Sequence, residues 1–242
     1  MNPRSAKEAE KLWSGVAKLV SRIKKTEIVI CPPFIYLEKL KKFSRKINLG
    51  AQDGFWGDVG PYTGEVSAEM LYDLRVRYVI LGHSERRTLG ETNSLINKKI
   101  KGALSAGLCP ILCVGESARE ADHGYFNLVK VQIEECLAGI SKNSISKIII
   151  AYEPVWALSS TLDRRDATAE DAREMAVFIR KILFDKFSNE AVGVRVIYGG
   201  SANEKDALDF LQNGRVDGLL PGKASLDAKK FSEIIKIAES LT

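Results

Sequence analysis

Short apolar segments alternate with amphipathic helical patterns along the whole of this 242-residue sequence. The apolar segments are rich in β-branched residues, which is typical of strands buried on both faces. A regular alternation of strand and helix predicts either a parallel barrel or a doubly wound sheet, both of the α/β class. The predicted strands are Glu27–Cys31, Ile47–Ala51, Tyr78–Gly82, Ile111–Val114, Lys147–Tyr152, Val194–Tyr198 and Val216–Leu220.

The first predicted element is a helix that precedes every strand. Ser5, followed three residues later by Glu8, forms a capping box at the start of a helix that reaches about Ile23. No long linker or change of composition divides the chain, so we expect one domain over residues 1–242. About seven strands are one too few for a closed eight-stranded barrel. The other predicted helices lie at about 36–43, 68–74, 93–106, 126–140, 168–187, 204–212 and 227–240.

Composition narrows the classes of function. A net charge of +5, with lysines spread over many segments, argues against nucleic-acid binding. No stretch reaches the roughly 18 apolar residues of a membrane span, and residues 1–4 contain no signal-peptide core. The cysteines mostly lie in apolar runs, so we expect reduced thiols and a cytoplasmic location. With only two histidines, a His-rich metal site is not expected.

Glu153 is the first candidate functional residue. It stands where the strand Lys147–Tyr152 should end, directly before Pro154, which favours extended geometry in the preceding residue. Parallel α/β folds place their chemistry at the carboxyl ends of strands. Taken alone, Glu153 could equally be a solvated residue in a loop.

His83 follows another predicted strand and stands beside the start of a short helical pattern. A helix N-terminus favours the neutral imidazole. The alternative is a histidine that satisfies a local backbone group. Two glycine-containing segments, 198–201 and 220–225, also follow strands and open toward helices, where backbone N–H groups can bind phosphate.

Six motifs in order give the whole chain a close resemblance to the triosephosphate isomerase family. They are Ala51-Gln52-Asp53, the segment from Tyr62 to Leu71, Gly82-His83-Ser84-Glu85-Arg86-Arg87, Cys113-Val114-Gly115-Glu116, Ala151-Tyr152-Glu153-Pro154-Val155-Trp156 and Tyr198-Gly199-Gly200-Ser201. The resemblance implies a TIM barrel that interconverts glyceraldehyde 3-phosphate and dihydroxyacetone phosphate, without a metal or another cofactor.

The resemblance also implies a role for individual residues. Glu153 corresponds to the base and His83 to the neutral electrophile, a pairing for which this family is a standard worked example. Glu85 is the third catalytic candidate, since it pairs with a catalytic lysine in the family. The candidate substrate-binding residues are Ser159, Ser201, Gly222 and Lys223. Thr63 corresponds to a loop that enters the active site of a partner subunit, which implies a homodimer.

The sequence departs from the family pattern at three places. The alignment begins just after the family's first strand, so that strand and its catalytic lysine have no counterpart here. The segment after Trp156 lacks the glycine-containing sequence of the family, and Lys223 replaces a glycine. We therefore expect an incomplete barrel of about seven strands beginning at the first helix, very low turnover, and a weakened dimer or a monomer.

Two interpretations of the missing strand remain open: Met1 is an internal methionine of a longer protein, or the chain is naturally truncated. The alternative function is a catalytically silent descendant that binds phosphate or acts as a scaffold. Glu153 and His83 favour the enzyme, whereas the absent lysine favours the silent protein.

Overall fold

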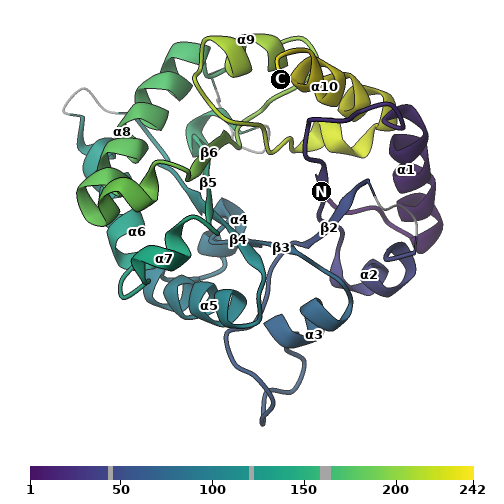
Figure 1. Cartoon of the computed structure of the whole chain (residues 1–242), viewed down its shortest axis with the longest axis horizontal. Helices are drawn as coiled ribbons and strands as arrows, with labels where there is room; N and C mark the ends of the chain where they lie inside the picture. Colours follow the sequence, from purple (N-terminus) through teal and green to yellow (C-terminus); the bar gives the residue numbers. More distant parts are fainter. Residues whose placement is uncertain (43–45, 120–122, 159–164) are drawn as a thin grey trace.

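The computed structural model describes residues 1–42, 46–119, 123–158 and 165–242. It shows a curled parallel sheet surrounded by a ring of helices (Figure 1). The strands are β1 (Val29–Ile30), β2 (Asn48–Ala51), β3 (Tyr78–Leu81), β4 (Cys109–Val114), β5 (Ile149–Tyr152) and β6 (Arg195–Tyr198). The helices are α1 (Ala6–Leu19), α2 (Phe34–Leu40), α3 (Ala68–Asp73), α4 (Ser84–Thr88), α5 (Asn93–Ser105), α6 (Gly124–Cys136), α7 (Lys142–Ile145), α8 (Ala169–Phe187), α9 (Ala207–Gln212) and α10 (Ala228–Ser240), with 3-10 turns η1 (Val155–Ala157), η2 (Ser188–Ala191) and η3 (Lys223–Leu226).

Each strand pairs in parallel with the next one in the sequence, from β1 to β6. The long apolar runs form the central strands, and every residue of β5 is buried. Side chains on one face of the sheet form an inner cluster that includes Tyr78, Ile111 and Ile149, whereas those on the other face pack under the helices. This arrangement explains why the strand sequences are apolar at successive positions.

The expected seventh strand, Val216–Leu220, forms only an isolated bridge. Leu219 pairs in parallel with Tyr198, and Leu220 donates its N–H to the Tyr198 carbonyl at 2.8 Å. The ladder is short because the carboxylate of Asp217 replaces a backbone acceptor and binds the Val196 N–H at 2.7 Å. The described residues therefore form six strands with one bridged segment rather than the seven strands predicted.

The sheet remains open between β1 and the bridged segment. Among the described residues β1 has a strand partner only in β2, and no ladder joins Glu27–Cys31 to Val216–Leu220, as the strand count predicted. The outer layer spans this side instead, because α1 and α10 pack side by side (Figure 1). The carboxylate of Glu239 in α10 accepts the backbone N–H groups of Lys24, Lys25 and Thr26 at 2.8–3.2 Å.

The first helix begins where the sequence predicts. The Ser5 hydroxyl accepts the Glu8 N–H at 3.2 Å, and Ala9, Trp13 and Val16 form its buried stripe. The second half of the capping box differs, since the Glu8 carboxylate accepts the N–H of Arg4 and not that of Ser5.

Four residues at the amino ends of strands meet across the barrel and are called here the Glu27 cluster. Glu27 precedes β1, and its carboxylate accepts hydrogen bonds from Asn48 of β2 at 3.1 Å, Tyr78 of β3, and Arg195 of β6 at 2.5 Å. Arg195 thus connects the far strand of the sheet to the segment that leads into β1.

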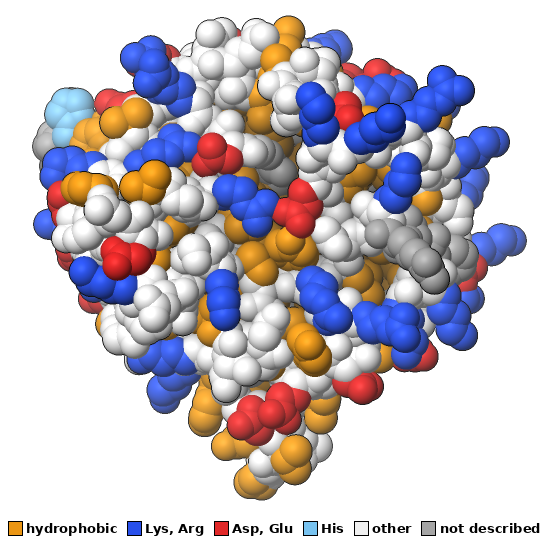
Figure 2. Space-filling view, in the orientation of Figure 1, with side chains coloured by type: hydrophobic (Ala, Val, Ile, Leu, Met, Phe, Trp, Pro, Cys, Tyr) orange, Lys and Arg blue, Asp and Glu red, His pale blue; other side chains and the backbone are white. Residues whose placement is uncertain are grey.

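A loop between β2 and α3 projects from the ring (Figure 1). Phe55, Trp56 and Tyr62 pack their rings together within it, with the Phe55 and Tyr62 centroids 4.8 Å apart. Val59 is 91% exposed. Figure 2 shows hydrophobic and acidic side chains over this projection, and basic side chains scattered over the rest of the same face. None of the helices in the described ranges is both long and apolar enough to cross a membrane.

Candidate active site

Glu153 stands directly after β5, at the carboxyl edge of the sheet. Its N–H donates to the Val114 carbonyl at 2.8 Å, and the carbonyl of Tyr152 accepts the N–H of Gly199 at 2.7 Å. These two bonds fix the backbone on either side of it. The Glu153 side chain is buried, with only 3% of it exposed.

Two neighbouring glycines leave room for Glu153. A Cβ atom at Gly115 would lie 1.8 Å from the Glu153 carbonyl oxygen, and one at Gly199 would lie 3.0 Å from its Cγ. Any side chain at Gly115 would therefore displace the strand end. The segment 198–201 was predicted to bind phosphate, and the structure adds that Gly199 accommodates the acid.

His83 and Glu153 face each other across the site. His83 Nε2 lies 3.2 Å from Glu153 Oε1, and the backbone N–H of Ser84 donates to Glu153 Oε2 at 3.0 Å. His83 Nδ1 accepts the N–H of Glu85 at 3.2 Å. Because Nδ1 accepts a hydrogen bond, the neutral ring carries its proton on Nε2, the atom directed at Glu153.

Burial raises the pKa of Glu153 above 4.5, and the nearby His83 and Ser84 offset only part of that increase. A carboxylate whose pKa is raised by desolvation is a stronger base than one in water, although the hydrogen bond from Ser84 weakens this effect. The pair therefore offers a proton acceptor beside an N–H donor, which is the arrangement needed to remove a proton next to a carbonyl group.

Glu85 lies near this pair without touching Glu153. Its side chain is 64% exposed, and its Oε2 lies 4.0 Å from His83 Nδ1. Within the described ranges, no lysine or arginine side chain forms an ion pair with Glu85 or Glu153. The structure thus brings three predicted catalytic residues together, but the part of the chain that it describes places no lysine or arginine in an ion pair with Glu85 or Glu153.

The predicted phosphate-binding residues leave the sheet from adjacent strands. Ser201 follows β6, and its hydroxyl donates to the Ala157 carbonyl at 2.9 Å, which links it to the segment after Glu153. Gly222 and Lys223 follow the segment bridged to β6, and the space where a Gly222 side chain would lie is open. Ser159, the remaining candidate, lies outside the described residues.

Glu116 and Arg119 belong to the site although sequence reasoning gave them no role. Glu116 is fully buried, and its Oε1 accepts the Tyr152 hydroxyl at 2.7 Å and the Trp156 indole N–H at 2.8 Å. Arg119 Nε lies 3.1 Å from the same oxygen. The available signal was a carboxylate placed two residues after the apolar run of β4, where burial requires a partner.

Comparison with known proteins shows the family to which the chain belongs. The family model described as triosephosphate isomerase matches residues 1–238. This chain belongs to the triosephosphate isomerase family. It is 43% identical over 238 residues to the triosephosphate isomerase of Dictyoglomus thermophilum, covering 96% of this chain and 94% of that one. It is 42% identical over 235 residues to that of Thermoanaerobacter pseudethanolicus, covering 94% and 92%.

A solved structure agrees with this assignment. The crystal structure of triosephosphate isomerase from Bartonella henselae superposes with a TM-score of 0.85 at 34% identity, over 98% of this chain and 94% of that one. The fold is therefore that of a TIM barrel. The match from residue 1 does not support the expectation that the chain is truncated.

A second charged cluster of this triosephosphate isomerase family member lies beneath the projecting loop. Lys99 is buried, with its Nζ 2.7 Å from Asp53 Oδ1 and 2.5 Å from Glu91 Oε1. Arg86 contacts the same two carboxylates at 3.0 and 2.6 Å. Two cations and two anions balance one another here, so the cluster offers no uncompensated charge to a ligand.

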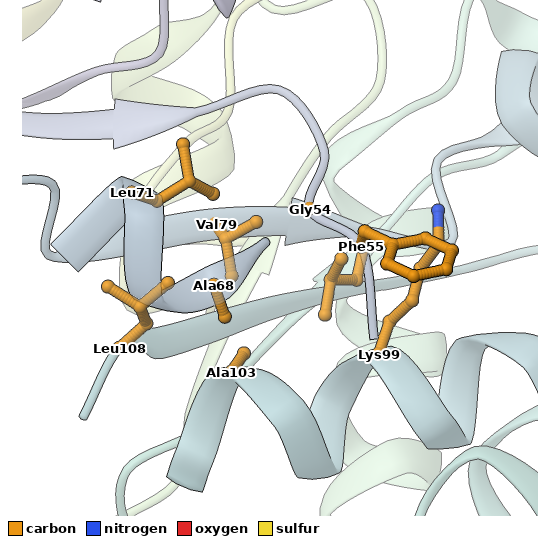
Figure 3. A pocket seen from close by; sticks show the side chains of 9 residues that line it. Gly54, Phe55, Ala68, Leu71, Val79, Lys99, Ala103 and Leu108 are labelled. Atoms are coloured by element: carbon orange, nitrogen blue, oxygen red, sulfur yellow. The ribbon is translucent and has the colours of Figure 1, made fainter. Parts of the chain in front are cut away.

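The apolar space beside Lys99 is a packing void. Figure 3 shows Val79, Ala103 and Leu108 directed toward it from β3, α5 and the start of the segment leading to β4. It does not admit a water molecule, so it is not a ligand site. Across the residues that the structure describes, no cluster of three or more His, Cys, Asp and Glu side chains is arranged to bind a metal ion.

Proposed function

We propose that the chain interconverts glyceraldehyde 3-phosphate and dihydroxyacetone phosphate, with Glu153 as the base and His83 as the electrophile. The observation that carries this proposal is the distance of 3.2 Å between Glu153 Oε1 and His83 Nε2 at the carboxyl edge of the sheet. The relatives named triosephosphate isomerase support the same substrates.

In this mechanism, ionised Glu153 removes a proton from the carbon beside the substrate carbonyl. The His83 Nε2–H donates a hydrogen bond to the carbonyl oxygen, where negative charge develops in the enediolate. Glu153 then returns the proton to the neighbouring carbon, while the hydroxyl proton of the enediolate passes to the former carbonyl oxygen. Together these two transfers exchange the positions of the carbonyl and hydroxyl groups. The carbonyl itself acidifies the C–H bond, so no redox cofactor enters the step.

The substrate phosphate would bind where the loops after β6 and the bridged segment meet. Ser201 would donate through its backbone N–H, and Gly222 and Lys223 through theirs. The ammonium group of Lys223 adds a positive charge at this edge, in a position where the family has glycine. Ser159 is kept in the proposal as a substrate-binding residue because the family resemblance implies it.

Turnover by these 242 residues is proposed to be very low. Glu85 and Glu153 lie without a lysine or arginine partner in the described part of the site. Loss of one preorganised donor costs about 10²–10³ in kcat. The enediolate and phosphate both carry negative charge, so loss of a full cation should cost at least that much.

The same missing cation favours a second function, that of a silent protein that binds phosphate or acts as a scaffold. A coupled isomerase assay in both directions separates the two, with Glu153→Gln as the control for contaminating enzyme. The proposal predicts weak turnover that Glu153→Gln abolishes. Equal rates in the parent and Glu153→Gln, together with phosphate binding detected by calorimetry, would establish the silent protein instead.

Assembly is part of the proposal. The projecting loop that includes Thr63 exposes apolar surface, which supports self-association. In a dimer, this loop would dock on the partner subunit. The open side of the sheet leaves that docking site incomplete, so we propose a weak dimer or a monomer.

A further inference from the structure

The carboxylate of Glu116 lies at the centre of the contacts that surround the base. It is fully buried, and its Oε1 receives hydrogen bonds from residues on both sides of Glu153, namely Tyr152 and Trp156. The Glu116 carbonyl also accepts the Val155 N–H at 2.9 Å. The segment that contains the base is thus attached to Glu116 at three points.

Arg119 is the cation that compensates this buried carboxylate. Its Nε lies 3.1 Å from Glu116 Oε1, and one terminal nitrogen donates to the Tyr152 hydroxyl at 3.1 Å and to the Asp171 carbonyl at 3.1 Å. The other terminal nitrogen contacts Asp171 Oδ1 at 2.8 Å and Glu174 Oε2 at 2.9 Å. All three nitrogens of the guanidinium are engaged.

The guanidinium is also packed between aromatic rings. Its central carbon lies 4.9 Å from the ring centre of Tyr125 and 5.4 Å from that of Trp156, and the side chain is 10% exposed. Arg119 therefore meets the segment 152–156 at both its ends, through the Tyr152 hydroxyl and the Trp156 ring. It connects them to α8, which supplies Asp171 and Glu174.

We infer that Arg119 is a positioning residue for the base: through Glu116, Tyr152 and Trp156 it fixes the segment that directs Glu153 at His83. The inference rests on the proposed isomerase function, since Glu153 acts as a base only in that reaction. A lysine could supply the charge but not the fork, because an ammonium group cannot reach α8, Glu116 and Tyr152 at once while stacking on an aromatic ring.

The kinetic test compares Arg119→Met and Arg119→Lys with Arg180→Met. Arg180 is a suitable control, because it also joins α8 to another segment, with 2.8 Å contacts to Asp217 and the Arg215 carbonyl. A misplacement of about 1 Å costs about 10² in rate. We expect kcat to fall about 100-fold in Arg119→Met and less in Arg119→Lys, with KM within about threefold of the parent on this reasoning.

A substrate isotope effect shows which step of the reaction is slowed in Arg119→Met. With dihydroxyacetone phosphate deuterated at the transferred position, Arg119→Met should show a primary effect on kcat at least as large as that of the parent, because proton transfer by a displaced Glu153 becomes slower and limits the rate. Arg180→Met should match the parent in both measurements. A kcat for Arg119→Met equal to that of Arg180→Met, or a loss seen only in KM, would overturn the inference.

A second measurement needs no turnover. In a Trp13→Phe, Trp56→Phe background, Trp156 is the sole source of indole fluorescence. Arg119→Met should change its emission and increase its quenching by acrylamide, whereas Arg180→Met should do neither. Unchanged Trp156 fluorescence in Arg119→Met would refute the positioning role. If Arg119→Met alters Trp156 fluorescence but the parent has no isomerase activity, the proposed function is refuted. The contact between Arg119 and Trp156 would still be supported.

Discussion

Glu27→Gln tests how the open sheet is stabilised. The substitution keeps the size of the side chain but removes the charge to which Tyr78 and Arg195 donate. The Glu27 cluster connects β6 and β3 to the start of β1, a strand whose only strand partner in the described residues is β2. We therefore expect the loss of stability in Glu27→Gln to appear first at β1.

The expected loss of stability in Glu27→Gln follows from how exposed the Glu27 and Arg195 side chains are. Glu27 and Arg195 side chains are 37% and 44% exposed, so their ion pair contributes only about 0–1 kcal/mol. Replacing a charge-assisted acceptor for Tyr78 with a neutral one costs about 1 kcal/mol more. The free energy of unfolding should fall by about 1–2 kcal/mol, which at this chain length lowers Tm by about 2–8 °C.

The effect should depend on pH. Partial burial alone would raise the pKa of Glu27, but hydrogen bonds from Tyr78 and Arg195 outweigh it and leave the pKa below 4.5. The stabilisation by a carboxylate with a lowered pKa is present above the unfolded value and is lost as pH falls through the folded value. The Tm difference between parent and Glu27→Gln should therefore disappear in acid.

The assay is thermal unfolding followed by circular dichroism, with hydrogen exchange of the β1 amides. Asp185→Asn is the matched control, since it removes a 2.6 Å ion pair to Lys181 on an exposed helix face and should cost less than about 0.5 kcal/mol. If Glu27→Gln unfolds at the same temperature as Asp185→Asn at neutral pH, the cluster does not stabilise the open sheet.

Two further predictions concern activity and assembly. Because burial raises the pKa of Glu153, kcat/KM should decline on acidification at a pH above 4.5, and a midpoint at or below that value would contradict the assignment. Light scattering at micromolar concentration should show a monomer or a dissociating dimer. A tight dimer at all concentrations tested would count against an incomplete docking site for the loop that includes Thr63.

The sequence was informative where one physical cause acts alone. Burial on both faces produces uninterrupted apolar runs, so the positions of β2 to β6 were predictable to within two residues. The carboxyl ends of parallel strands meet at one edge, which explains why Glu153 and His83 could be expected to lie close together.

Other features depended on partners distant in the sequence. Asp217 looks like part of a strand, but its side chain binds the Val196 N–H and shortens the ladder. Arg119 lies in a polar segment, and its role is defined by Tyr152, Asp171 and Glu174, of which Glu174 is 55 residues away. No local pattern contains such information, because each contact exists only once β4, β5 and α8 are packed together.

The order in which the strands pair also determines which contacts can form early during synthesis and which must wait for the end of the chain. Each strand pairs with the one synthesised just before it, so each pairing can form once that strand and the preceding one have emerged on the growing chain. The contacts of Glu239 with Lys24 and Lys25 span more than 200 residues and must wait for α10. Until α10 emerges, the face of α1 that packs against it remains uncovered on the nascent chain, which leaves this helix open to misassembly and to chaperones for most of synthesis.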